Sequence, residues 1–333
     1  MSSSTSFHQS SRQQKPPKRS WASTSVSDFQ AVLKSSKRVL ALCGAGLSAS
    51  SGLETFRGAG GMWRNYKASA LATPEAFEND PGLVWLFYAY RRHKALNAKP
   101  NMGHYALAEL ARRKGEEGFM CLSQNIDGLS QRANHPAAQL KLLHSSLFDL
   151  KCFSCPYIEK DNFSDPLHPS LIIDEASITA RLSAASKTNK KSLSNSTSKS
   201  PTIPIDELPH CPACKTGLLR PGVVWFDESL PKQTLTEIDQ WIGSGLIDLC
   251  LVIGTTAQVY PAASYVQVAS KEGARIAVVN MDSRELGSAG SLRSVDFLFE
   301  GDAARVLPDI LGGVVGGLEE FCGGGGDGER GSG

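Results

Sequence analysis

The chain has 333 residues, of which 41% are hydrophobic and 20% are charged, and its formal net charge at pH 7 is +2. This length accommodates one large domain, or one large and one small domain, with an ordinary globular composition. The net charge argues neither for nor against nucleic acid, and no apolar run approaches the roughly 18 residues of a membrane span, so we expect a soluble protein without a membrane partner.

Residues 1–27 contain no acidic residue and many serines. This composition is typical of a transit peptide, although Pro16 and Pro17 would interrupt a helix. A plain disordered tail and a weak nuclear signal at "KPPKR" remain alternatives. The first helix is expected to begin near Ser27 or Asp28, with Ser27 as a candidate N-cap.

Apolar segments then alternate with helical ones. Strands are expected within 38–43, 118–125, 140–148, 248–256, 274–282 and 295–301. Helices are expected from Pro74, with Thr73 as the cap, and within 81–96, 100–113 (ended by Gly115) and 261–273. This alternation predicts an α/β fold with a Rossmann-like, doubly wound parallel sheet.

A glycine-rich stretch, "CGAGLSASSGLETFRGAGGMW", follows the first expected strand from Cys43 to Trp63. Backbone N–H groups in such a turn can approach a phosphate closely, and "GAGLSA" matches the G-x-G-x-x-G/A pattern of dinucleotide sites. A glycine-rich surface loop is the alternative. Polar residues also end three later strands, at "QNID", "GTT" and Asn280, so these strand ends are expected to converge on one ligand.

Eight cysteines are present, and three of them (Cys43, Cys121 and Cys250) lie in apolar runs that indicate buried side chains. Cys322 lies in the glycine-rich tail, and the remaining four form two C-x-x-C pairs, which are Cys152, Cys155, Cys211 and Cys214. Four thiolates complete a tetrahedral zinc site and leave no open position, so a structural Zn²⁺ is expected. A redox role would need only one pair, and a nucleic-acid-binding finger would need a basic helix between the pairs.

Domain boundaries follow from these segments. We expect a disordered segment at 1–27, a Rossmann-like NAD-binding domain at 28–145 and 222–311, and a zinc module at 146–221. A helical insertion is expected at about 64–115, a flexible serine- and lysine-rich insertion at about 183–201, and a glycine-rich disordered tail at 312–333.

Taken together, these motifs resemble the sirtuins, a family of NAD-dependent protein-lysine deacylases. The resemblance rests on "GAGLSASSGLETFRG", "SQNID", "LHSS" where the family has "HG", the two C-x-x-C pairs, "GTT" where most members have "GTS", and "VVN". It covers about Asp28 to Leu311 in consistent order. It implies that NAD is consumed as a co-substrate and that acylated lysines of proteins are the other substrate.

The markers "TFRGAGGMWR", "LATPEAF", "LLRPGVVWFDE" and "VYPAA" are most similar to the sirtuin-5 subgroup, which removes malonyl, succinyl and glutaryl groups. In that subgroup a Tyr-x-x-Arg pair, here Tyr88 and Arg91, binds the acidic end of the acyl group, and Ala72 widens the pocket. Arginine forms bidentate pairs with carboxylates, and a phenol adds a hydrogen bond. Without the resemblance, Tyr88 would be read as core and Arg91 as a surface ion pair.

The resemblance also implies the residues that bind NAD. They are Gly44, Ala45, Gly46 and Ser48 at the phosphates, Phe56, Arg57 and Trp63 near the nicotinamide ribose, Gln124, Asn125 and Asp127 at the ribose and amide, and Gly254, Thr255, Thr256, Asn280, Met281 and Ala303 at the adenosine half.

The catalytic residues implied are His144 and Asn125. The acyl oxygen attacks C1′ of the ribose, nicotinamide leaves, and His144 acts as general base on a ribose hydroxyl. The products are free lysine, nicotinamide and 2′-O-acyl-ADP-ribose. The substrate backbone is expected to pair, as an added strand, with Val224, Trp225 and Phe226.

Three departures from the family pattern bear on these expectations. Ser145 replaces a glycine, which is costly if that position needs a positive φ, so rate is the property in doubt. Thr256 keeps the hydroxyl of the usual serine. Ala303 replaces a cysteine that contacts adenine through its backbone, so little change is expected there.

Three alternatives stay open: plain deacetylation, mono-ADP-ribosyl transfer with the same NAD chemistry, and a weakly active NAD-binding scaffold. A hydride-transferring dehydrogenase is disfavoured, because no acidic residue follows the second strand at the usual spacing. We expect a monomer without a nucleic-acid partner, located in mitochondria, with cytoplasm or nucleus as alternatives.

Overall fold

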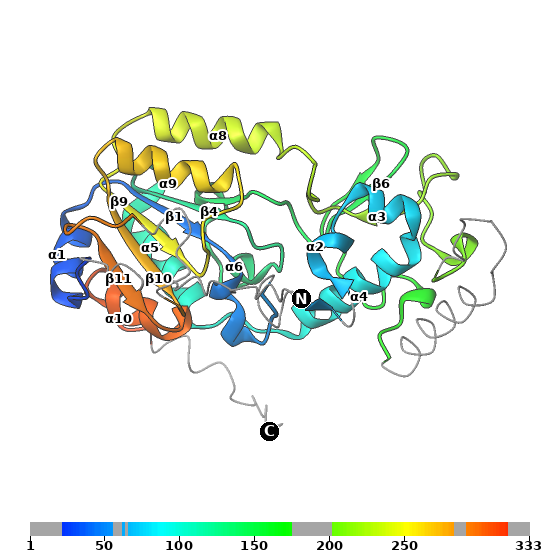
Figure 1. Ribbon diagram of the computed structural model, residues 1–333, viewed down its shortest axis with the longest axis horizontal. Helices are drawn as coiled ribbons and strands as arrows, with labels where there is room; N and C mark the ends of the chain where they lie inside the picture. The colour runs from blue at the N-terminus through cyan, green and yellow to red at the C-terminus, as the bar shows by residue number, and fades with distance from the viewer. Residues whose placement is uncertain (1–21, 56–61, 64–65, 175–201, 283–290, 319–333) are drawn as a thin grey trace, which may run out of the picture.

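The computed structural model describes residues 22–55, 62–63, 66–174, 202–282 and 291–318 (Figure 1). The helices are α1 (Val26–Ser35), α2 (Ala68–Leu71), α3 (Pro74–Asn79), α4 (Pro81–Asn97), α5 (Met102–Gly118), α6 (Leu129–Arg132), α8 (Lys232–Gly243), α9 (Ala262–Lys271) and α10 (Ala303–Val315). The strands are β1 (Val39–Cys43), β2 (Met62–Trp63), β3 (Tyr66–Lys67), β4 (Phe119–Ser123), β5 (Leu140–Leu142), β6 (Leu150–Cys152), β7 (Ile158–Glu159), β8 (Leu219–Pro221), β9 (Leu249–Ile253), β10 (Arg275–Asn280) and β11 (Phe297–Glu300).

The larger unit is built on a six-stranded sheet with the order β11-β10-β9-β1-β4-β5. All neighbouring strands are parallel, and β1 lies between β4 and β9. Read from β5, this is the strand order of a Rossmann fold, whose direction of winding reverses between β1 and β9. The predicted fold class is therefore confirmed, and ligands of such sheets bind at this reversal point.

Alternation along β1 places its side chains in two cores. Val39, Ala41 and Cys43 pack with residues of α1, α5 and α10, whereas Leu40 and Leu42 pack with residues of α8 and α9. The two helical layers cover opposite faces of the sheet (Figure 1). The strand is fully buried because both of its faces are covered, which explains why its sequence is continuously apolar.

The smaller unit combines α2, α3 and α4 with a three-stranded antiparallel sheet, in the order β7-β6-β8 (Figure 1, right). Its own apolar core contains Trp85 and Phe87 of α4. The indole of Trp85 donates to the carbonyl of Leu219 at 2.8 Å, and Arg92 donates to the carbonyls of Leu147 and Asn162 at 2.8 and 2.7 Å. These bonds fix α4 to the cysteine-bearing sheet.

Three boundaries differ from the expectations. Ser25 rather than Ser27 caps α1, since its side chain accepts from the N–H of Asp28. Helix α5 packs in the core of the large sheet, so the helical insertion ends before it rather than at 115. The glycine-rich tail does not begin at 312, because α10 continues to Val315, whose side chain is buried against that same core.

Other local expectations agree with the structure. Thr73 caps α3 by accepting from the N–H of Ala76, and Gly115 interrupts α5 with a φ of +71°. Residues 1–21, the predicted insertion at 183–201 and the end of the tail lie outside the described residues. Within the described ranges, no helix has both the length and the apolar character needed to span a bilayer.

Candidate functional site

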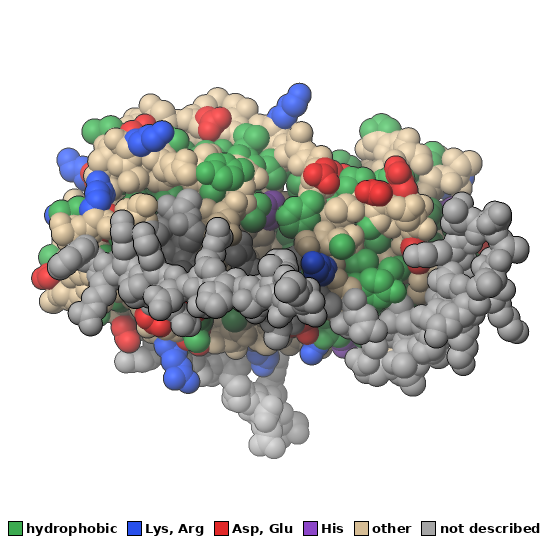
Figure 2. All heavy atoms as spheres, viewed as in Figure 1, with side chains coloured by type: hydrophobic (Ala, Val, Ile, Leu, Met, Phe, Trp, Pro, Cys, Tyr) green, Lys and Arg blue, Asp and Glu red, His purple; other side chains and the backbone are tan. Residues whose placement is uncertain are grey.

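A cavity of about 950 Å³ lies at the carboxyl ends of the central strands and extends to α4 of the smaller unit. Its lining contains most of the predicted site residues: Gly44, Ala45, Gly46, Ser48, Ala72, Tyr88, Arg91, Gln124, Asn125, Asp127, His144, Val224, Trp225, Phe226, Gly254, Thr255, Thr256, Asn280 and Met281. On the face shown in Figure 2 the molecule is hollowed between its two units. Segments distant in the sequence thus meet at one site.

The loops that follow β1 and β9 touch each other through their backbones. The N–H of Gly46 donates to the carbonyl of Gly254 at 2.9 Å. A Cβ on Gly46 would meet the Cα of Gly254 at 2.6 Å, and Gly254 itself has a φ of +58°. Glycine is required here for contact between the loops, which leaves their edge as exposed backbone that a phosphate can approach.

The polar residues after β4 are bonded to both of these loops. Asn125 donates through Nδ2 to the carbonyl of Gly44 at 3.0 Å, and Gln124 donates through Nε2 to Oγ1 of Thr255 at 3.1 Å. The hydroxyl of Ser48 donates to Asp127 at 2.7 Å. Three segments of the nucleotide end, which follow β1, β4 and β9, are therefore preorganised by these hydrogen bonds.

The imidazole of His144 is held in one tautomer. Its Nδ1 lies 2.9 Å from the carbonyl oxygen of Gln124, and a carbonyl only accepts, so Nδ1 carries the proton and Nε2 has a free lone pair. Burial lowers the pKa of His144 below 6.5, although the bond to Gln124 opposes this shift. The ring is therefore neutral at physiological pH and suited to act as a base.

His144 lies in the turn after β5 rather than in a strand, since β5 ends at Leu142. The next residue, Ser145, has a φ of +61°. This is the left-handed region, where a residue with a Cβ is strained. The strain is located directly beside the candidate base.

The other end of the cavity is formed by α4. Tyr88 and Arg91 lie one turn apart on this helix and both line the cavity, as does Ala72. Burial raises the pKa of Tyr88 to about 12, so the phenol is neutral. Burial lowers the pKa of Arg91, which still remains cationic because guanidinium stays protonated in proteins. The cavity thus ends in a neutral donor and a cation.

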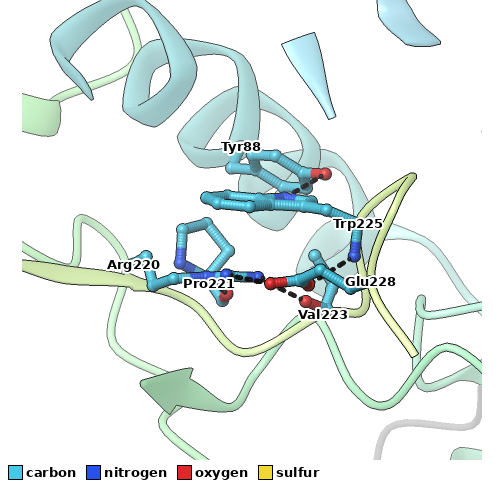
Figure 3. A network of polar contacts seen from close by, with 6 residues as sticks. All are labelled: Tyr88, Arg220, Pro221, Val223, Trp225 and Glu228. Carbon is cyan, nitrogen blue, oxygen red and sulfur yellow. Dashed lines mark hydrogen bonds and ion pairs between the residues drawn. The ribbon is translucent and has the colours of Figure 1, made fainter. Parts of the chain in front are cut away.

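Trp225 links Tyr88 to two residues that the sequence analysis did not assign to the site. Its indole Nε1 donates to the Tyr88 oxygen at 3.0 Å, and its ring lies 3.4 Å from the Arg220 guanidinium carbon (Figure 3). Arg220 forms a two-pronged ion pair with Glu228, at 2.5 and 2.9 Å. The sequence signal that could have indicated this ion pair is an arginine before "VVWF" and a glutamate after it.

The segment expected to pair with substrate already uses its N–H groups. Val224 donates to the carbonyl of His144 at 3.0 Å, and Phe226 donates to that of Ala72 at 2.9 Å. Trp225 donates to the carboxylate of Glu228 at 2.8 Å. An added substrate strand would therefore bond to this segment through its carbonyl groups.

Two predicted NAD residues do not line the cavity. Trp63 is buried and packs against Phe87 and Tyr90 of α4, with ring centroids 5.6 and 6.3 Å apart. Ala303 is buried at the start of α10. Phe56 and Arg57 lie outside the described residues. Glu54, Lys94 and Tyr260 line the cavity but were not predicted as site residues. Glu54 and Tyr260 fall within the quoted motifs "GAGLSASSGLETFRG" and "VYPAA", which assigned them no role.

The four predicted zinc ligands come together at the base of the small sheet. The sulfurs of Cys152, Cys155, Cys211 and Cys214 all lie within 4.8 Å of one another. The pairs Cys152–Cys214 and Cys155–Cys211 are both 3.7 Å apart. A tetrahedral Zn²⁺ with bonds of about 2.3 Å requires sulfur separations of about 3.8 Å, so the cluster fits the metal.

Backbone donors surround these sulfurs and favour thiolates. The N–H groups of Ser154 and Ala213 donate to Cys152 and Cys211 at 3.3 and 3.4 Å. Donation from Gly217 and Thr216 lowers the pKa of Cys214 to about 6. A thiolate set without an open position supports a structural rather than a catalytic zinc.

Comparisons with known proteins agree with this geometry. A model of the Sir2 family matches residues 44–261. An NAD-dependent protein deacylase of Candida albicans is 45% identical over 303 residues, which are 87% of this chain and 98% of that protein. The mitochondrial NAD-dependent protein deacylase sirtuin-5 of Canis lupus familiaris is 38% identical, over 87% of this chain and 86% of that protein.

A solved structure gives the same result for the fold. The crystal structure of a Sir2 homologue in complex with NAD superposes with a TM-score of 0.66 at 32% identity. The match covers 86% of this chain and 93% of that one.

Proposed function

Because the chain belongs to the Sir2 family, we propose that it is an NAD-dependent protein-lysine deacylase that prefers malonyl, succinyl and glutaryl groups. NAD is its co-substrate, and acylated lysines of proteins are the other substrate. The observation that carries the proposal is one cavity, lined by the glycine loops and His144 as well as by Tyr88 and Arg91.

The nucleotide end supplies binding and general-base chemistry. The glycine loops after β1 and β9 have no side chains that would keep the pyrophosphate away from their backbone, while Asn125 and Asp127 orient the ribose and the nicotinamide amide. The acyl oxygen attacks C1′ and nicotinamide leaves. Nε2 of His144 then takes a proton from the ribose 2′-hydroxyl, whose oxygen attacks the acyl carbon. Water then adds to this carbon, the bond to the lysine nitrogen breaks as the amine is protonated, and lysine and 2′-O-acyl-ADP-ribose are released.

The acyl end supplies the substrate preference. A malonyl, succinyl or glutaryl group ends in a carboxylate, which pairs with the guanidinium of Arg91 and accepts from the hydroxyl of Tyr88. Charge-assisted hydrogen bonds of this kind are about twice as strong as neutral ones. An acetyl group has no carboxylate to make these two contacts, so acetyl substrates should react more slowly.

The zinc site supports the acyl end of the cavity indirectly. Cys152, Cys155, Cys211 and Cys214 would hold one Zn²⁺ that stabilises the small sheet without contacting substrate. The same sheet is bonded to α4, which carries Tyr88 and Arg91. The metal therefore supports the surface against which the acyl group binds.

We further propose a mitochondrial location. The sirtuin-5 relatives of dog and zebrafish are named mitochondrial, and residues 1–27 have the acid-free, serine-rich composition of a transit peptide. Imaging of fluorescent fusions with and without residues 1–27 tests this. Loss of mitochondrial signal on deletion is expected, and an unchanged distribution would contradict it.

The acyl preference is tested with peptides that differ only in the lysine modification, by following nicotinamide release. Succinyl and malonyl peptides should exceed acetyl peptide in kcat/KM. Arg91→Met should lower kcat/KM for the acidic acyl groups by about 10- to 100-fold and change the acetyl value little, because a lost hydrogen bond to a charge is worth about 1.5–3 kcal/mol.

A matched control is Arg113→Met, which removes an arginine that pairs with Glu109 on α5, outside the cavity. It should leave the ratio of succinyl to acetyl turnover unchanged. Activity on acetyl peptide alone would reject the acyl preference while leaving the deacylase assignment in place.

A further inference from the structure

Arg220 and Glu228 form an ion pair that is built into the wall of the cavity. Arg220 is only 5% exposed. Both of its terminal nitrogens bond to Glu228, while its Nε donates to the carbonyl of Pro221 at 3.1 Å and Nη2 donates to that of Val223 at 2.9 Å. Such a set of bonds fixes the plane of the guanidinium (Figure 3).

That plane forms the surface on which Trp225 rests. The guanidinium carbon lies 3.4 Å from the centre of the indole ring. Glu228 holds the same residue a second time, since it accepts the backbone N–H of Trp225 at 2.8 Å. In Figure 3 the indole lies between Arg220 on one side and Tyr88 on the other. Both the backbone and the ring of Trp225 are therefore positioned by the ion pair.

The indole N–H of Trp225 determines in which direction the Tyr88 hydroxyl can donate a hydrogen bond. An indole N–H is only a donor, so the Tyr88 oxygen is the acceptor of their 3.0 Å bond. The proton of the hydroxyl must then point to another acceptor. Tyr88 lines the cavity beside Arg91, so a carboxylate bound to Arg91 is an acceptor of suitable charge.

We propose that Arg220 and Glu228 are positioning residues for an acidic acyl group, because they orient Trp225 so that its indole N–H sets the Tyr88 hydroxyl as a donor toward the acyl carboxylate. This inference rests on the proposed preference for malonyl, succinyl and glutaryl groups. Neither residue touches the acyl group itself. They act through Trp225 on the direction in which the Tyr88 hydroxyl proton points.

A purely structural role predicts a different outcome from a positioning role. If the ion pair only stabilised the segment from 220 to 228, its loss would impair acetyl and succinyl substrates alike. If it sets the hydroxyl, the loss falls on KM for acidic acyl groups. The pKa of Glu228 agrees with a tight pair: burial would raise it, but the hydrogen bonds from Arg220 and Trp225 outweigh burial and lower it.

The test uses Arg220→Lys, which keeps the charge but loses the flat, forked guanidinium. KM for a succinyl-lysine peptide should rise about tenfold, as expected for one misdirected hydrogen bond to a charge. Its kcat, and both constants for an acetyl-lysine peptide, should change less than about twofold. The matched control is Glu237→Gln, which breaks an ion pair with Lys141 outside the cavity and should leave the ratio of the two KM values unchanged. A parallel loss for both peptides, or no change in either, would overturn the proposal.

A second measurement needs no substrate. In a ¹⁵N spectrum the indole resonance of Trp225 is identified by its absence in Trp225→Phe, and Tyr88→Phe shows how it moves when its acceptor is lost. Arg220→Lys should shift it in the same direction, and an unmoved resonance would contradict the proposal. If Arg220→Lys does not fold, Glu228→Asp serves both measurements, since the shorter carboxylate cannot reach Arg220 and the Trp225 N–H together. A wild-type protein without acidic-acyl preference rejects the proposed function and the specificity role with it, whereas a wild-type preference with an unmoved indole rejects the positioning role alone.

Discussion

The two ends of the cavity are made in different ways. At the nucleotide end, loops after β1 and β9 meet backbone to backbone, and the gap between Gly46 and Gly254 leaves no space for a Cβ. At the acyl end, side chains of α4 face the segment that carries Trp225, and buried aromatic and ionic contacts hold them. Backbone atoms thus shape one half and side chains shape the other.

Because of this difference, the residues for NAD binding and catalysis are separate from those that select the acyl group. A backbone surface recognises what all NAD molecules share, and side-chain substitutions change it little unless they obstruct the loops. A side-chain surface can be altered one group at a time. Changes at the nucleotide end should therefore affect every acyl substrate equally, and changes at the acyl end should affect them selectively.

The largest effect is expected for His144→Ala, because His144 serves both ends. Turnover of every acyl peptide should fall by about 10²- to 10⁴-fold, the usual contribution of a general base. NAD binding, measured by calorimetry, should persist. His93→Ala, which removes an exposed histidine paired with Asp165, is the control and should be active. Selective loss for one acyl group would place His144 in the specificity end instead.

Gly46→Ala should break the nucleotide end alone. The added Cβ would meet Gly254 Cα at 2.6 Å and force the two loops apart. KM for NAD should rise by about tenfold or more, because displacements of 1 Å in a binding site are costly, and the ratio of succinyl to acetyl turnover should stay constant. Gly243→Ala, where no atom lies within 4 Å of the new Cβ, should leave both quantities unchanged. A changed acyl ratio in Gly46→Ala would show that the two ends are coupled.

The pH dependence sharpens the same comparison. His144 acts as a base only when neutral, and burial lowers its pKa below 6.5. Activity should therefore be lost through protonation of the imidazole at a lower pH than for an unperturbed histidine. The acidic limb of kcat/KM should coincide for acetyl and succinyl peptides, since an acyl carboxylate titrates near pH 4. A limb above pH 6.5, or two different limbs, would contradict this assignment.

The smallest effect is expected for Ser145→Gly, next to the base. Its φ of +61° suits glycine, so the substitution should raise the free energy of unfolding by about 0.5–1 kcal/mol and the melting temperature by about 1–3 °C. Ser264→Gly, the same change inside helix α9, should be destabilising instead. If Ser145→Gly also raises kcat, the strain displaces His144; an unchanged kcat with higher stability would confine the strain to folding.

The nucleotide end could be predicted from the sequence because its signals are local. Each strand, such as β1 or β9, is a continuous apolar run, and the residues proposed to bind NAD follow directly after it. The parallel sheet then brings these strand ends to one edge. His144 was expected within a strand at 140–148, but β5 ends at Leu142, two residues before it.

The acyl end was harder to predict because its contacts are long-range. The Tyr88–Trp225 bond joins α4 to a segment 137 residues away, and no periodicity indicates such a bond. Arg220 and Glu228 look like ordinary charges until Trp225 is seen between Tyr88 and Arg220. The N–H groups of 224–226 look free in an apolar sequence, yet the fold uses all three internally.

The cysteine cluster has a further consequence, for chain length. Cys155 and Cys211 are separated by 55 residues, yet their sulfurs lie 3.7 Å apart. The entropic cost of closing a loop grows only with the logarithm of its length, by about 0.6 kcal/mol for each doubling. The free energy of metal binding at the two ends of the loop would offset this entropic cost. Evolution can therefore lengthen or shorten this excursion while α4 and the residues that recognise the acyl group keep their places.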